Sequence, residues 1–200
     1  AGTRPDVPLS VASVSELVSR IGVGRFQVFA MIALLGFPLS EGADMLTIGS
    51  LARALQMEWG LSNLQAGALA SSSFIGLAIG TYGSGYIADV KGRRAAILSS
   101  YFGMAFIGAS SSMAAGFRTM LVLRFLNGAA AGLGVPAASA MLTEVVPMER
   151  RAVFFVFLQV SYTIGELYAC LGLLIYVPDL ADPTRWRAVS NWASVPSVVF

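Results

Sequence analysis

The chain has 200 residues, of which 56% are hydrophobic and 12% are charged, and its mean hydropathy is +0.73. Soluble domains carry about 25% charged residues, so this composition indicates a protein whose solvent is lipid. The net charge of +2 does not indicate a nucleic-acid partner, and one cysteine without any histidine excludes an internal disulfide and gives no zinc-site signature. We recognise no nucleophile–base pair and no phosphate-binding loop, so we expect neither an enzyme nor a bound metal or cofactor.

Apolar stretches long enough to cross a bilayer, which takes about 20 residues, follow one another along the chain. Residues 1–24 are predicted to form a cytoplasmic N-terminal segment, and residues 25–200 a transmembrane unit. The spans are expected near residues 26–55, 64–88, 95–115, 120–142, 153–177 and 189–200. Because the chain begins with Ala1 and stops at Phe200 inside the last span, we expect that span to be truncated and the chain to be part of a longer protein.

Basic residues are concentrated on one side of the expected bilayer. That side holds Arg4, Arg20, Arg25, Lys91, Arg93, Arg94, Arg150 and Arg151. The other side holds Arg118, Arg185 and Arg187, with Arg53 near its boundary. Because cytoplasmic loops are enriched in Lys and Arg, we expect a multi-pass protein of a plasma or vesicle membrane with its N-terminus in the cytoplasm.

The turn between the second and third spans reads Gly85-x-x-x-Asp89-x-x-Gly92-Arg93-Arg94. Asp89 lies at the C-terminal end of one helix and the two arginines open the next, so both signs of charge oppose the helix dipoles. Charges placed in this way need partners on other elements. We therefore predict that this turn is a switch and not only a connection.

Small residues four positions apart occur in the second and fourth spans, as Gly76 and Gly80 and as Gly128 and Gly132. This spacing lets two helix backbones approach closely. The spacing fits a fixed packing contact, and it also fits helix faces that rock against each other.

Ionisable residues inside the expected spans are the main candidates for a functional site, because each costs about 2.5–3.5 kcal/mol at the bilayer centre on insertion scales. Glu41 and Asp44 share one face of the first span, Arg124 lies in the fourth, and Glu166 lies in the fifth. Two further polar residues, Gln159 and Tyr162, are spaced to share a face with Glu166. We predict that these six residues line a substrate or proton path.

Each of these candidates also has a purely structural interpretation. Glu41 could lie in a hydrated vestibule, Arg124 could form a structural ion pair, and Glu166 could bond to a neighbouring helix. Two ionised carboxylates on one face repel each other, so Glu41 and Asp44 would also suit proton exchange near neutral pH.

Three motifs in order resemble the major facilitator superfamily. They are the Gly85–Arg94 turn, Arg124-x-x-x-Gly128-x-x-x-Gly132, and Glu144-x-x-Pro147-x-x-x-Arg151. Further segments resemble the branch of synaptic-vesicle glycoproteins and vesicle-related proteins, which is similar to organic-ion and sugar-porter-like carriers. These segments are Arg25-Phe26-Gln27, Glu58-Trp59-Gly60-Leu61-Ser62 and Trp186-Arg187. One departure is Val90, which stands where the superfamily commonly has a basic residue.

The resemblance implies an all-α membrane protein, the six-helix N-terminal half of a twelve-span bundle that works by alternating access. It also implies a cytoplasmic gate. The gate residues would be Gly85, Asp89, Gly92, Arg93 and Arg94, joined by Glu144 and Arg151.

The function that follows is secondary active transport of a small organic solute, coupled to protons. The expected partners are that solute, protons, the lipid bilayer and the missing C-terminal half of the same chain. The alternative is a non-transporting vesicle-membrane scaffold or receptor on the same fold.

Overall fold

The structure is a computed structural model that describes residues 24–177 and 185–200. The predicted N-terminal segment, residues 1–24, therefore lies outside the described part of the chain except for Gly24. The elements are α2 (Arg25–Trp59), α3 (Asn63–Lys91), α4 (Arg93–Ser111), α5 (Phe117–Val145), the 3-10 turn η1 (Met148–Arg150), α6 (Arg151–Tyr176) and α7 (Trp186–Val199). The described residues contain no strand, which confirms the expected all-α class.

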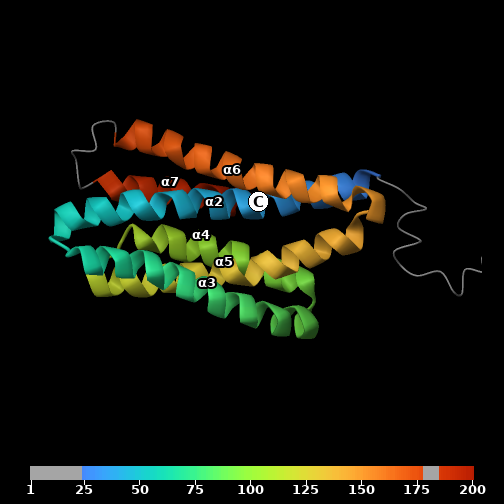
Figure 1. Cartoon of the computed structure of the whole chain (residues 1–200), viewed down its shortest axis with the longest axis horizontal. Helices are drawn as coiled ribbons and strands as arrows, with labels where there is room; N and C mark the ends of the chain where they lie inside the picture. Colours follow the sequence, from blue (N-terminus) through green and yellow to red (C-terminus); the bar gives the residue numbers. More distant parts are fainter. Residues whose placement is uncertain (1–23, 178–184) are drawn as a thin grey trace, which may run out of the picture.

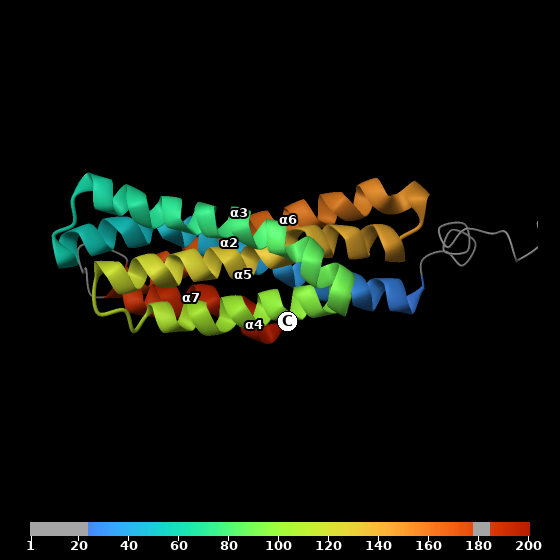
Figure 2. The ribbon, with the colours of Figure 1, turned by 90° about the horizontal axis from the view of Figure 1, so that it is seen from below.

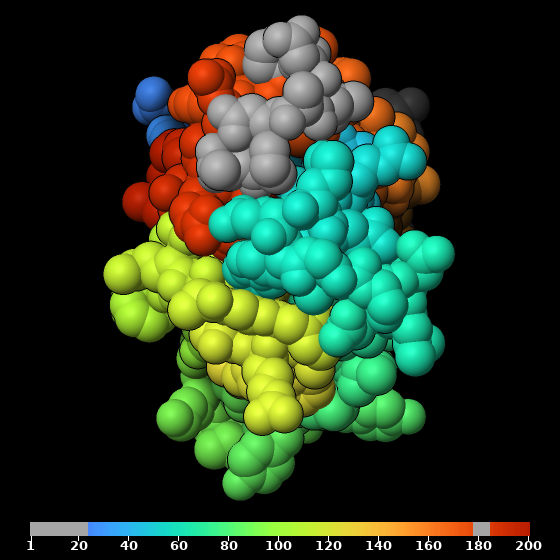
Figure 3. Space-filling model, turned by 90° about the vertical axis from the view of Figure 1, so that its left-hand side faces the viewer, coloured from blue at the N-terminus to red at the C-terminus, as the bar shows by residue number. Residues whose placement is uncertain are grey.

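The helices run side by side along the long axis of the molecule, and successive helices reverse direction (Figures 1 and 2). The most extensive contact joins α3 to α5, followed by those of α2 with α6 and of α4 with α5. We call the end that holds the start of α2, the α3–α4 turn at Gly92 and η1 the basic end. The other end, called here the far end, holds the α2–α3 and α4–α5 turns and the start of α7 (Figure 3).

Four helical segments are long and apolar enough to cross a membrane, namely Arg25–Trp59, Asn63–Lys91, Phe117–Val145 and Met148–Tyr176. Helix α2, with 35 residues, extends about 50 Å at about 1.5 Å per residue, which exceeds a hydrocarbon core of about 30 Å. The remaining helices are shorter, with 19 residues in α4 and 14 in α7. Large apolar side chains such as Phe74, Phe102 and Leu174 are exposed, as expected for surfaces that face lipid.

Local sequence explains the sharp turn between α2 and α3. Gly60 has φ 63°, in the left-handed region that favours glycine. Ser62 then caps α3, because its Oγ accepts a hydrogen bond from the backbone N–H of Gln65 at 3.3 Å and its own N–H donates to the Gln65 side chain at 2.9 Å. The two helices therefore return antiparallel to each other with only three residues between them.

Glycines allow the two closest helix crossings. In the α3–α5 crossing, a Cβ placed on Gly76 or Gly80 would collide with the backbone of α5, and one on Gly128 or Gly132 with the backbone of α3. The close approach fits both interpretations of the glycine spacing, a fixed packing contact and helix faces that rock against each other, and rocking stays a prediction.

The α2–α6 crossing was not predicted from the sequence, because each helix supplies only one glycine there. Gly42 lies against the carbonyl of Tyr162, and Gly165 against that of Leu39. Ser161 supports the crossing by donating a hydrogen bond to the Leu35 carbonyl at 2.6 Å. This close approach brings Gln159 and Tyr162 of α6 next to Glu41.

Candidate functional site

A buried ion pair joins α2 to α5 in the middle of the bundle. Arg124 Nη1 lies 3.0 Å from Asp44 Oδ1, and the two side chains are only 3% and 15% exposed. The second carboxylate oxygen accepts a hydrogen bond from Asn127 Nδ2 at 2.8 Å. Asp44 is therefore neutralised by one neighbour and oriented by another, which satisfies the usual requirements for a charge in the membrane.

The donors and acceptors around this ion pair are not fully used. Arg124 Nε and Asn127 Oδ1 are both buried, and neither has a hydrogen-bond partner among the described residues. An unpaired buried polar atom is costly, so the cluster holds its charges together without saturating them.

Asn127 is a member of this cluster that sequence reasoning missed. It lies three positions after Arg124 on α5 and is only 2% exposed. Residues three apart share a helix face, so its spacing from Arg124 was the signal that could have revealed it.

Glu41 lies apart from the ion pair in a separate cavity of about 180 Å³. Gln159 and Tyr162 of α6 line the same cavity, together with Ser139 of α5. Among the described residues Glu41 has no ion-pair or hydrogen-bond partner. The structure thus brings Glu41, Gln159 and Tyr162 together as a polar lining between α2, α5 and α6.

Glu166 is half-buried one turn beyond Tyr162 on α6. The Tyr162 side chain interacts electrostatically with both Glu41 and Glu166. Tyr162 therefore lies between two carboxyl groups, one on α2 and one on its own helix.

At the basic end a second ion pair joins α4 to α5. Arg93 Nε donates to Glu144 Oε1 at 2.5 Å, and the two side chains are 39% and 54% exposed. The turn before Arg93 depends on Gly92, whose φ of 85° favours glycine.

The other predicted gate residues do not join this pair in the described structure. Arg151 donates to the backbone carbonyl of Val146 at 3.3 Å and not to Glu144. Asp89, Arg94 and Gly85 are exposed, and Asp89 has no ion-pair partner among the described residues. The α3–α4 turn thus leaves one acidic group available to another element.

A family model described as the Major Facilitator Superfamily matches residues 30–196. The chain belongs to the major facilitator superfamily. Residues of the first two resembling motifs lie at the α3–α4 turn and at the α3–α5 crossing.

Known members of the superfamily are similar to most of the chain. The Synaptic vesicle 2-related protein of Rattus norvegicus is 31% identical over 188 residues, which are 94% of this chain and 33% of that protein. The Gentisate transporter of Corynebacterium glutamicum is 27% identical over 179 residues, or 90% of this chain and 40% of that protein. The chain therefore spans between a third and two fifths of the length of these relatives.

A solved superfamily structure shows the same fold. The proton:xylose symporter XylE superposes with a TM-score of 0.76 at 19% identity, over 88% of this chain and 44% of that one. At this identity the likeness concerns the fold alone. The described helices correspond in extent to about half of a complete transporter bundle.

Proposed function

We propose that the full-length protein is a secondary active transporter that moves a small organic solute across a membrane by alternating access, coupled to protons. The observation that carries the proposal is the buried Asp44–Arg124 pair, together with a separate cavity lined by Glu41, which has no ion-pair or hydrogen-bond partner among the described residues. Buried ionisable groups of this kind mark ion or substrate paths in membrane bundles. Superfamily membership makes transport the expected use of such a path.

The class of solute is proposed from the relatives. Their printed names include gentisate and 4-hydroxybenzoate transporters and an organic cation/carnitine transporter. The cavity at Glu41 offers polar groups and three aromatic rings, those of Phe37, Phe155 and Tyr162, which suits a small organic molecule. A solute would bind between these helices and those of the rest of the protein.

Proton coupling is proposed from the chemistry of Asp44. While ionised, this carboxylate holds Arg124 and Asn127 and so joins α2 to α5. A proton on Asp44 would remove the charge that attracts Arg124 and would loosen this connection. Proton binding would thereby change the contact between two helices that border the proposed path.

The Arg93–Glu144 pair is proposed to belong to a gate that closes the basic end. Because basic residues favour the cytoplasmic side, this end is proposed to face the cytoplasm. Labelling with a membrane-impermeant thiol reagent from each side tests this, with Lys91→Cys and Asn63→Cys introduced separately into a Cys170→Ala background.

The test of function uses the full-length protein in proteoliposomes. Uptake of gentisate, 4-hydroxybenzoate, carnitine and xylose would be measured with and without an imposed proton gradient. We expect the gradient to accelerate uptake of at least one solute, and Asp44→Asn to abolish that acceleration. Glu149→Gln, which removes an exposed carboxylate in η1, is the matched control. Unchanged uptake by Asp44→Asn at every pH would contradict the role of Asp44.

The alternative, a non-transporting scaffold or receptor on the same fold, makes a different prediction. It predicts no uptake of any of these solutes by native protein that is correctly folded and oriented. It is favoured only by the likeness to the Synaptic vesicle 2-related protein.

A further inference from the structure

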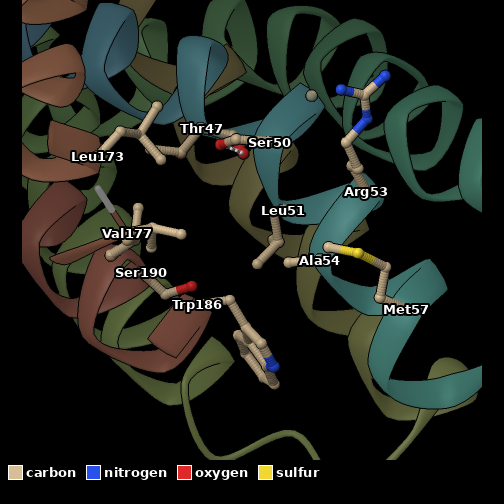
Figure 4. A pocket seen from close by; sticks show the side chains of 12 residues that line it. Thr47, Ser50, Leu51, Arg53, Ala54, Met57, Leu173, Val177, Trp186 and Ser190 are labelled. Atoms are coloured by element: carbon tan, nitrogen blue, oxygen red, sulfur yellow. Dashed lines mark hydrogen bonds between the residues drawn. The ribbon is translucent and has the colours of Figure 1, made fainter. Parts of the chain in front are cut away.

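A second cavity, of about 330 Å³, lies between α2, α6 and α7 towards the far end of the bundle (Figure 4). It shares no lining residue with the cavity at Glu41. Most of its wall is apolar, with Leu51 on α2, Leu173 on α6 and Trp186 on α7. Its volume falls at the lower end of the range of about 300–1,000 Å³ that is typical of small-molecule sites.

One hydroxyl group in the cavity wall, that of Ser190, has no hydrogen-bond partner among the described residues. Ser190 is 5% exposed, and its oxygen points into the space between Leu51 and Trp186 (Figure 4). The other two hydroxyls among the described lining residues already donate hydrogen bonds. Thr47 donates to the Asp44 carbonyl at 2.7 Å and Ser50 to the Thr47 carbonyl at 3.0 Å. A hydroxyl can both donate and accept a hydrogen bond, so the free Ser190 hydroxyl is available to a ligand that enters the cavity.

The wall opposite α2 is held in place, so the cavity is preformed. The indole N–H of Trp186 donates to the Glu58 carboxylate. Its ring meets that of Trp59 edge to face with centroids 5.7 Å apart. The Arg187 guanidinium lies 4.4 Å from the same ring, and it also pairs with Glu58 at 3.0 Å. A wall fixed by these contacts does not have to be ordered when a ligand binds, which favours binding.

The charge of the wall limits what the cavity can hold. Among the described lining residues Arg53 is the only ionisable one, and its guanidinium points away from Ser190 and Trp186 (Figure 4). A charged ligand would therefore lose its hydration without gaining a partner inside.

We propose that this cavity binds a small, uncharged and largely apolar molecule, such as a substituted benzene ring, with one hydroxyl group hydrogen-bonded to Ser190. This ligand is distinct from the transported solute, because it occupies a separate cavity. The proposal does not depend on transport activity.

The experiment uses the full-length protein in nanodiscs, with 4-bromobenzyl alcohol as the probe and 4-bromotoluene as its counterpart without a hydroxyl. Bromine in contact with an indole quenches its fluorescence, and comparison with Trp186→Phe isolates the contribution of Trp186. We expect saturable quenching of Trp186 by the alcohol, with about fivefold weaker binding in Ser190→Ala, the effect of one neutral hydrogen bond. 4-Bromotoluene should bind native protein about as weakly as the alcohol binds that variant.

A second variant narrows the cavity without disturbing the fold. Gly49 lines the cavity, and a Cβ placed there meets no heavy atom within 4 Å. Gly49→Leu should abolish saturable quenching, whereas Gly67→Leu, at an equally open position on α3, should not. Quenching that never saturates, or that is equal in all variants, would overturn the proposal. Saturable quenching by a brominated phospholipid would also overturn it, because the occupant would then be a lipid chain.

Discussion

Helix α5 takes part in two arginine–carboxylate pairs, Arg124 with Asp44 in the middle of the bundle and Glu144 with Arg93 at its basic end. The first pair is almost completely buried, and an amide orients its carboxylate. The second is open to solvent and has no further side-chain partner among the described residues. The same chemistry therefore has different consequences at two places on one helix.

Burial explains the difference. A buried ion pair stabilises the fold little compared with an apolar pair, but loss of one partner leaves an uncompensated charge, which costs about 3–5 kcal/mol. An exposed pair is worth about 0–1 kcal/mol and is screened by salt. Loss of a charge in the middle of the bundle should therefore lower the stability strongly. At the basic end the ion pair can break and form again at a small cost in free energy. These properties are the ones expected of a coupling site and of a gate.

The largest expected effect is that of Arg124→Leu. It leaves Asp44 buried without a cation, so the free energy of unfolding should fall by about 3–5 kcal/mol. Denaturant unfolding of the full-length protein in detergent would measure this change. Adding Asp44→Asn to Arg124→Leu should recover much of the loss. If the free energy of unfolding fell by less than about 1 kcal/mol, as expected for an exposed pair, the buried and the exposed ion pair would not differ in their contribution to stability.

The next effect concerns the crossing that positions Arg124. A Cβ on Gly128 would meet the Ser73 carbonyl of α3, so Gly128→Ala should destabilise by about 1–3 kcal/mol through overpacking. Gly83→Ala is the matched control, because its Cβ would meet only the Leu133 side chain at 3.6 Å. The control should be neutral or slightly stabilising, since alanine favours helix. Unfolding temperatures of both variants would measure the difference, and an equal change in the two variants would contradict the close helix crossing at Gly128.

At the basic end, Glu144→Gln should change stability by about 0–1 kcal/mol, and the difference should shrink at high salt. Unfolding measured at low and high ionic strength would show this. If the pair belongs to a gate, the same variant should also slow turnover. A large loss of stability that does not depend on salt would show that water is excluded from this pair as it is from the pair in the middle of the bundle.

The smallest expected effect on stability is that of Asp89→Asn, because this carboxylate is exposed and has no ion-pair partner among the described residues. We expect no measurable change in unfolding but slower transport, with little change in the apparent affinity for solute. Arg93→Ala should slow transport in the same way, while its effect on stability should match that of Glu144→Gln because it breaks the same pair. Uptake kinetics in proteoliposomes would separate the two quantities, and normal turnover in both variants would exclude these residues from a gate.

Several features of the site could be read from residue spacing alone. The four glycines of the α3–α5 crossing stand out because helix periodicity puts residues four apart on one face. Asp44 and Arg124 stand out because a charge in an apolar span is rare. Neither signal identifies the partner of a residue. From the sequence alone, Asp44 could equally have shared a proton with Glu166 or accepted a hydrogen bond from Tyr162.

The amino-acid sequence by itself determined the solvent, the helical class, the superfamily and the list of intramembrane charges. It could do so because hydropathy, periodicity and charge are local properties of a chain. Only the tertiary structure decided that Arg124 pairs with Asp44 and Glu144 with Arg93, that Asn127 completes the first cluster, and that Ser190 faces a cavity. These relations depend on which helices cross and at what height, and that is set by packing between residues far apart in the chain.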